Sequence, residues 1–220
     1  MKRRQLMTWM GGAVLMSFWQ AHDGHAQSPS PSQSQSQSSL PDWLTEAARR
    51  MDNAVVIRGD FEQIKAIKGF KKPLLSRGRF LIARGQGIQW LTLEPFPSTL
   101  VVTRERLMTV TEGGVQQMDA RQEPGLRAVN ELLMAVLGGD LRALGKRFQV
   151  DGALQGSQGW RMSLVPKDEA LRRFIARIDM EGDRHVQQVR LTEGSGDESR
   201  IRFAHHSSTS LTQAEAARFN

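Results

Sequence analysis

Short runs of alternating apolar and polar residues fill most of the chain from residue 55 onward. Runs of period two that are bounded by Gly, Pro and charged residues are typical of antiparallel strands joined by turns. They predict about eleven strands, over Val55–Ile67, Arg77–Ala83, Gly87–Leu93, Thr99–Val102, Arg106–Thr111, Val115–Met118, Phe148–Leu154, Trp160–Val165, Phe174–Met180, His185–Leu191 and Ser199–His205. A sheet with this many strands tends to curl. We therefore expect a mainly β protein with one curved antiparallel sheet.

Helical spacing replaces this alternation in two places. Apolar residues from Trp43 to Met51 recur at helical intervals behind Asp42, which predicts an N-terminal helix with Asp42 as its N-cap. A central helix is predicted between Pro124 and Gly138, and a short helical piece over Asp140–Leu144. The apolar stripe of the central helix consists of Leu126, Val129, Leu132, Leu133, Val136 and Leu137.

The first 26 residues are predicted to be a secretory signal peptide. A basic start, Lys2–Arg4, precedes the apolar run Leu6–Trp19, and Gly24-His25-Ala26 offers small residues at the positions that signal peptidase requires. The alternative is an uncleaved membrane anchor, but this run is shorter than the roughly 20 residues that span a bilayer. We expect cleavage after Ala26 and export to the periplasm.

Composition divides the remainder into a linker and one domain. Residues 27–39 are almost entirely Ser, Gln and Pro, have nothing to bury and are expected to be a disordered linker. Residues 40–220 are enough for one sizeable core. The domain boundaries predicted from sequence are therefore 1–26, 27–39 and 40–220.

The charge balance and the absence of cysteine narrow the function. The chain carries a net charge of +7, and loss of Lys2, Arg3, Arg4 and Asp23 with the signal removes a net +2 and leaves +5. Such a surface could favour anionic partners or lipid head groups, or could serve solubility alone. Nucleic acid is not an expected partner of an exported chain without an aromatic and basic binding motif. Zero Cys excludes disulfides, thiolate metal sites and a catalytic thiol.

Candidate catalytic constellations are missing from the sequence. Besides two histidines in the signal, the chain has His185, His205 and His206. Adjacent residues of a strand point to opposite faces, so His205 and His206 are not expected to bind one metal ion together. No metal-binding His motif or nucleophile elbow occurs. We therefore predict a protein that is not an enzyme and that uses no catalytic residue, metal or cofactor.

The order of several motifs resembles that of the LolA family, the periplasmic carriers that bring lipoproteins to the outer membrane. Phe61-Glu62-Gln63 is followed by a Gly-led strand that ends at Arg84, a strand that carries Trp90, and the Pro loop 93–96. The likeness continues at residues 160–167 and in the closing segment 211–219. Two departures stand out: Arg84-Gly85 where the family usually has Arg-Pro, and Arg177 where an apolar residue is expected, with Ile178 taking that role.

The resemblance implies an open half-barrel whose central helix is a lid over an acyl-binding cavity. Arg84 would be the latch, because its planar fork can donate to the carbonyls of a helix end; the alternative is a solvated turn residue. The lid would present Val129, Leu132, Leu133, Val136 and Leu137. The cavity would be lined by Phe61, Phe80, Ile82, Ile88, Trp90, Val101, Phe174 and Phe203, although such residues also suit an ordinary core of helices on a sheet.

The function implied is that of a monomeric periplasmic carrier of acylated lipoproteins or of a related lipid. Its partners would be an inner-membrane loading complex and an outer-membrane acceptor. An acceptor anchored by lipid would need an N-terminal Cys, which this chain lacks. The departures suggest a divergent member whose cargo belongs to a dedicated pathway. The alternative is a periplasmic module of the same fold that senses a lipid or a protein and transports nothing.

Overall fold

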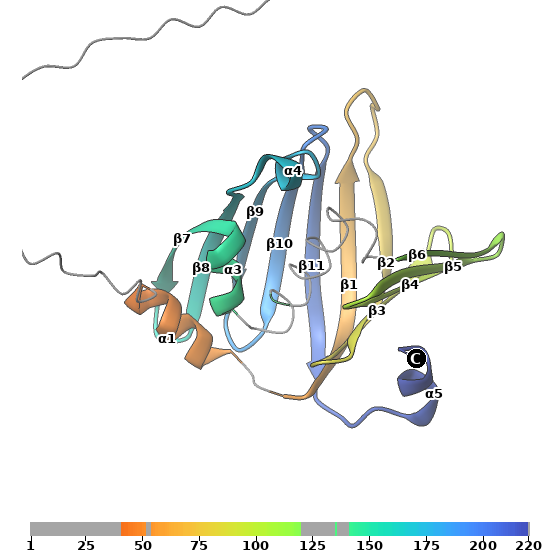
Figure 1. Ribbon diagram of the computed structural model, residues 1–220, viewed down its shortest axis with the longest axis horizontal. Helices are drawn as coiled ribbons and strands as arrows, with labels where there is room; N and C mark the ends of the chain where they lie inside the picture. The colour runs from red at the N-terminus through yellow and green to blue at the C-terminus, as the bar shows by residue number, and fades with distance from the viewer. Residues whose placement is uncertain (1–40, 52–53, 120–134, 136–140, 220) are drawn as a thin grey trace, which may run out of the picture. The chain divides into compact units, whose positions relative to one another are not determined.

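One antiparallel sheet of eleven strands dominates the computed structural model (Figure 1). The structure describes residues 41–51, 54–119, 135 and 141–219, all within the compact unit Ser38–Asn220. The spatial order of the strands is β6-β5-β4-β3-β2-β1-β11-β10-β9-β8-β7, and the sheet is not closed. The strands are β1 (Val56–Ala66), β2 (Leu74–Ala83), β3 (Gly87–Glu94), β4 (Ser98–Thr103), β5 (Arg106–Thr111), β6 (Gly114–Asp119), β7 (Phe148–Gln155), β8 (Gly159–Pro166), β9 (Ile175–Gly182), β10 (Val186–Glu193) and β11 (Glu198–Ser207). The mainly β prediction is confirmed.

The described helices are short and lie at the borders of the sheet. They are α1 (Asp42–Arg50), α3 (Leu141–Arg147), α4 (Glu169–Arg172) and α5 (Gln213–Ala217). The predicted cap of α1 is wrong: Pro41 is the N-cap, and Asp42 lies in the first turn. A carboxylate in the first turn still interacts favourably with the positive end of the helix dipole. Asp42 therefore does mark the start of the helix, but one residue after the N-cap.

Helices α4 and α5 escaped prediction because four or five residues cannot show a helical period. Side chains define their starts instead. The Asp168 carboxylate accepts the Leu171 amide at 2.7 Å, and Thr212 forms a reciprocal capping box with Glu215. The predicted central helix lies outside the described residues except for Ala135, which is helical and buried in the main core.

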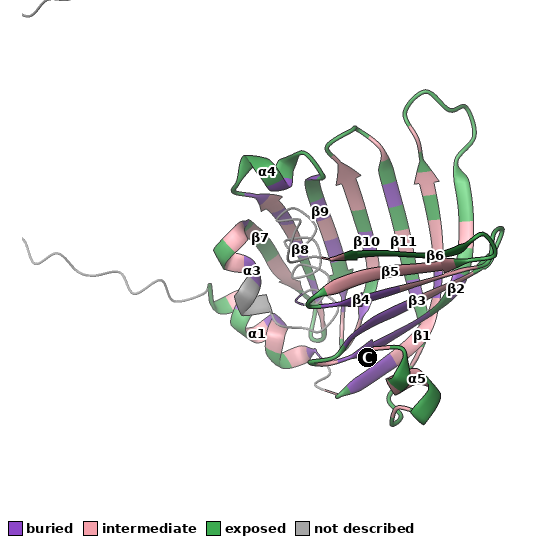
Figure 2. Cartoon of the chain, turned by 45° about the vertical axis from the view of Figure 1, so that its right-hand side comes forward, coloured by how far each residue is buried: buried purple, intermediate pink, exposed green. Residues whose placement is uncertain are grey.

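The two faces of the sheet bury different sets of residues. The inner face packs against Leu44 and Ala47 of α1, against Met51 just after it and against Leu144 of α3, and contributes most of the main core. Along β9–β11, buried and exposed residues alternate (Figure 2). The end of β2, from Phe80 to Ala83, is buried without interruption, because both of its faces are covered there.

The C-terminal segment 208–219 supplies the cover on the outer face. Leu211 and Phe219 pack against a small second core of Val56, Leu81 and Ala83. The Arg58 guanidinium donates to the Thr209 hydroxyl, to the Ser210 carbonyl and to the Glu215 carboxylate. Hydrogen bonds from Thr212, together with the Arg58 charge, hold the pKa of Glu215 below its ordinary value. The segment is therefore fixed by both ion pairing and apolar contact.

Candidate functional site

Two reciprocal pairs of glycine and phenylalanine shape the inner face where β1 meets β2. Gly59 lies opposite Phe80, and Phe61 lies opposite Gly78. A Cβ atom placed on Gly59 would lie 2.8 Å from the Phe80 ring, and one on Gly78 would lie 2.8 Å from the Phe61 ring. Each ring thus occupies the space that the missing side chain leaves on the neighbouring strand.

Four aromatic rings form a continuous cluster on this face. The Phe61 and Trp90 rings stack with centroids 3.8 Å apart. Phe203 meets Phe80 edge to face at 5.1 Å and Trp90 at 5.9 Å. Since these residues come from β1, β3, β11 and β2, the cluster spans four adjacent strands. The cluster belongs to the main apolar core, in which Phe61, Phe80 and Phe203 are each less than 10% exposed.

Six of the eight residues predicted to line a cavity come together on the inner face: Phe61, Phe80, Ile82, Ile88, Trp90 and Phe203. Ile82 and Ile88 are directly paired across β2 and β3, and the next residue in that row is Val102 on β4. All three are at least 96% buried. The inner face therefore continues as an apolar row beyond the aromatic cluster.

The structure does not bring Val101 and Phe174 to this face, which corrects the sequence prediction. Val101 belongs to the row of Leu81 and Gln89 on the outer face, where the Gln89 side chain donates to the Glu215 carbonyl at 2.7 Å. Phe174 precedes β9 and is 54% exposed. The run Leu100-Val101-Val102 is apolar throughout, so its pattern could not distinguish the two faces.

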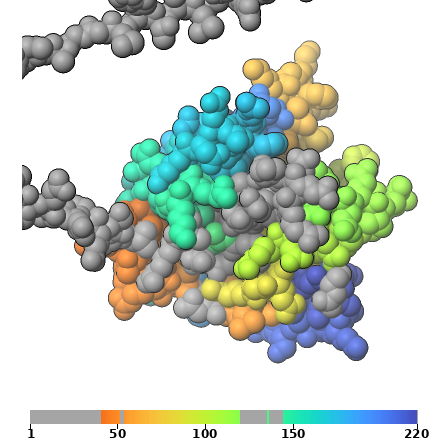
Figure 3. Space-filling view, viewed as in Figure 1, coloured from red at the N-terminus to blue at the C-terminus, as the bar shows by residue number. Residues whose placement is uncertain are grey.

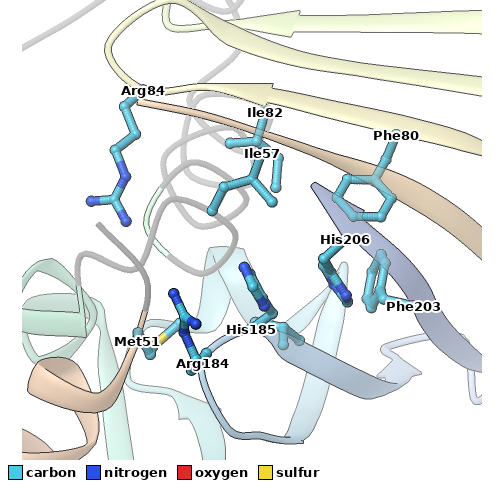
Figure 4. Close-up of a pocket in the computed structure, with 10 residues that line it drawn as sticks. Met51, Ile57, Phe80, Ile82, Arg84, Arg184, His185, Phe203 and His206 are labelled. Carbon is cyan, nitrogen blue, oxygen red and sulfur yellow. The ribbon is translucent and has the colours of Figure 1, made fainter. Parts of the chain in front are cut away.

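A small pocket closes the end of the inner face near Arg84 (Figure 4). Its apolar lining comes from Met51, Ile57, Phe80, Ile82, Val186 and Phe203, and its polar lining from Arg84, Arg184, His185 and His206. It encloses about 20 Å³, room for about one water molecule. Apolar walls and basic groups therefore meet at the same place.

Arg84 is held at this position by the turn between β2 and β3. It is half-buried, and its amide donates to the Val55 carbonyl at 2.9 Å. The following Gly85 has φ of 77°, in the left-handed region. Proline, whose φ is fixed near −65°, cannot adopt that conformation. The change from Arg-Pro to Arg-Gly thus goes with a turn of different geometry.

A β-bulge turns His206 into the pocket, which the sequence did not predict. The pairing of β1 with β11 shifts register between Arg58 and Asp60, and His205 has φ of 53°. As a result His205 is exposed and its Nδ1 lies 2.8 Å from Asp60. His206 instead stacks on His185, with centroids 4.5 Å apart and planes at 12°. No sequence signal marks a bulge that has a histidine, and not a glycine, at positive φ.

Burial and a neighbouring imidazole both oppose a charge on His206. Burial lowers the pKa of His206 below its ordinary value of 6.5, and the proximity of His185 lowers it further. A backbone hydrogen bond with Val186 and the Asp183 carboxylate act in the opposite direction. The neutral form of His206 is consequently favoured in the folded protein.

Lowering the pH below about 6.5 should therefore destabilise the folded protein through His206. Because the pKa in the folded state lies below that in the unfolded state, the stabilisation is fully present above the unfolded value of 6.5 and is lost as pH falls through the folded value. Urea unfolding at a series of pH values measures this slope. His206→Phe, which keeps a ring but cannot titrate, should flatten it, whereas exposed His205→Gln should keep most of it. Equal slopes in wild type and His206→Phe would contradict the assignment.

The described part of the chain holds no group of three or more His, Asp or Glu residues placed to bind a metal ion. Within the same residues, no helix has the length and apolar character needed to cross a membrane.

Comparisons with known proteins identify the family. The family model described as outer membrane lipoprotein carrier protein LolA matches residues 52–219. A solved LolA superfamily protein from Nitrosomonas europaea aligns with a TM-score of 0.44 at 10% identity, covering 78% of this chain and 94% of its own. A DUF1329 family protein from Desulfovibrio piger gives 0.46 at 10% identity over 78% and 93%.

The MucA/MucB complex from Pseudomonas aeruginosa aligns with a TM-score of 0.44 at 14% identity, covering 80% of this chain and 59% of that chain. A search of curated proteins gives no match. The family model spans well over half of the chain. This protein belongs to the LolA family.

Proposed function

We propose that this protein is a periplasmic carrier that binds the acyl chains of lipoproteins, or of a related lipid, against its inner face and passes them toward the outer membrane. The observation that supports this most directly is the four-ring cluster of Phe61, Phe80, Trp90 and Phe203 on the inner side of an open sheet. Membership of the LolA family supports the same class of cargo. A loading complex in the inner membrane and an acceptor in the outer membrane would be its partners.

The small size of the pocket fits a carrier that must release what it binds. Each methylene removed from water contributes about 0.8 kcal/mol, so a single long acyl chain would gain roughly 10 kcal/mol on full burial. The pocket beside Arg84 has room for about one water molecule, so acyl chains could enter there only after it opens. The free energy of opening would offset part of the gain and keep release possible.

A matched pair of neighbouring residues tests where cargo binds. Ile82 and Leu81 are 4% and 6% exposed on the same strand but face opposite sides of the sheet. Replacing either with Trp should overpack its surroundings, at about 1–3 kcal/mol of stability. Only Ile82→Trp places the added ring where acyl chains would bind. We expect it to abolish binding of a fluorescent fatty acid, with Leu81→Trp binding as wild type does.

Unchanged probe binding by a folded Ile82→Trp variant would contradict an acyl site at this end of the inner face. Mass spectrometry of lipids that co-purify with the protein tests carriage itself. Phospholipid or acylated lipoprotein would support it. Preparations that never contain lipid would instead favour a sensing module of the same fold.

A further inference from the structure

Large exposed apolar side chains gather at the end of the sheet opposite the Arg84 turn. The hairpin between β1 and β2 projects from this end (Figures 1 and 3). Every residue from Lys68 to Leu75 is exposed. Phe70 is 73% exposed, Leu74 52% and Leu75 45%. Exposed apolar side chains that gather in one patch call for an explanation, because such patches mark interaction surfaces.

Neighbouring connections extend this apolar surface on both sides of the hairpin. Arg77 of β2 pairs with Glu94, which places the loop bearing Phe96 beside the hairpin. On the other side, the Lys68 amide donates to Asp197 in the β10–β11 turn, and the Gly194 amide of that turn donates to the Phe174 carbonyl. The apolar rim, as we call this surface, consists of Phe70, Leu74, Leu75, Leu93, Phe96 and Phe174, each between 45% and 79% exposed.

Positive charge surrounds the tip of the rim. The connection 67–73 contains Lys68, Lys71 and Lys72 and no acidic residue. Two carboxylates near the hairpin are paired: Glu62 with Arg77 at 2.9 Å, and Glu193 with Lys65 at 2.6 Å. Phenylalanine and leucine side chains flanked by lysines match the interface of an anionic bilayer, where rings enter the boundary of the acyl chains and ammonium groups stay among the head groups.

We propose that the apolar rim docks this protein on the surface of an anionic phospholipid bilayer, with Phe70 inserted at the head-group boundary. The hairpin is a projection with apolar side chains at its tip and cations around them. A fluid lipid surface can accept such a projection without a preformed cavity, which favours a bilayer over an acidic protein groove. The proposal does not depend on acyl binding at the inner face, because the apolar rim and the aromatic cluster have no residue in common.

Binding of the full chain to phosphatidylethanolamine–phosphatidylglycerol vesicles that contain no lipoprotein tests the proposal. We expect co-sedimentation at low salt and much weaker binding to phosphatidylcholine vesicles. Phe70→Ser should weaken binding by tenfold or more, on the order expected for loss of one buried aromatic side chain. Lys71→Gln with Lys72→Gln should weaken it by roughly fivefold per lysine. Val55→Ser and Arg104→Gln, at exposed positions at the opposite end, are the matched controls and should bind as wild type does.

Insertion can be read separately from attraction because the chain has no cysteine. Phe70→Cys can carry a single environment-sensitive dye, whose emission should shift to the blue on anionic vesicles, while the same dye at Val55→Cys should not respond. Absence of binding to anionic vesicles would overturn the proposal. So would binding that depends on the lysines alone and leaves the dye at position 70 in water, since that result would indicate charge attraction to the bilayer without insertion.

Discussion

The Gly78→Val variant should lose about 3 kcal/mol or more of its free energy of unfolding, at the upper end of the effects of overpacking. A Cβ atom at this position would lie 1.9 Å from the Leu91 carbonyl oxygen and 2.8 Å from the Phe61 ring. The oxygen belongs to the backbone of the adjacent strand, so relief requires the strands to separate. Displacing Phe61 would also break its stack on Trp90, which contributes about 0.5–1.5 kcal/mol beyond burial.

Urea unfolding monitored by tryptophan fluorescence measures this loss. Gly113→Val is the matched control, because the nearest atom to its added Cβ would be the Thr111 hydroxyl at 3.7 Å, an ordinary contact. The control should change stability by less than about 0.5 kcal/mol, as is usual for surface substitutions. If Gly78→Val lost equally little stability, the close approach of Gly78 to Leu91 of β3 and to the Phe61 ring would not be needed for the fold.

The Arg84→Leu variant should take up cargo normally and release it at least about tenfold more slowly. As a latch, Arg84 would donate to helix carbonyls in the empty, closed state, and each charged hydrogen bond contributes about 1.5–3 kcal/mol. The loaded, open state would not use these bonds, so their loss raises only the free energy of the empty state. Leucine keeps an apolar stem in the pocket that Ile82 and Met51 line. The equilibrium therefore moves toward retention.

Release of a bound fluorescent lipid to acceptor vesicles, followed with time, measures the effect. Arg84→Lys keeps the charge without the planar fork and should fall between wild type and Arg84→Leu. Arg104→Leu, in the exposed turn between β4 and β5 at the same end of the sheet, should release as wild type does. Release from Arg84→Leu at the wild-type rate would make Arg84 an ordinary turn residue.

Alternation predicted the strands well because one face of most of them is covered and the other is not. The strand at Arg106–Thr111 has the predicted bounds, and, apart from the start of β2, the ends of the other strands lie within two residues of those predicted. The largest boundary error is the start of β2, which begins at Leu74 and not at Arg77. Residues 74–76 are largely exposed and carry two leucines, so the pattern gave no sign of a strand that reaches beyond the core.

The site was only partly predictable because long-range register decides which face a residue occupies. Val101 and Val102 are equally apolar, and only the pairing of Ile88 with Val102 shows which one faces inward. His206 reaches the pocket through a bulge whose two strands lie at opposite ends of the domain sequence. Gly59 and Gly78 look like ordinary glycines until the facing rings are known. Local pattern contains none of this information.

The position of β1 in the middle of the sheet sets the order in which the domain can fold. Strands β1 to β6 pair with sequence neighbours, as do β7 to β11, and Phe61 meets Phe203 only where the first strand pairs with the last. The central strand therefore lacks one neighbour until nearly the whole domain is available to fold. Pairing across such a separation closes a long loop and is intrinsically slow. Until β11 pairs with it, the open edge of β1 is a template for wrong partners, and keeping the unfolded chain apart from its copies protects the strand that carries Phe61.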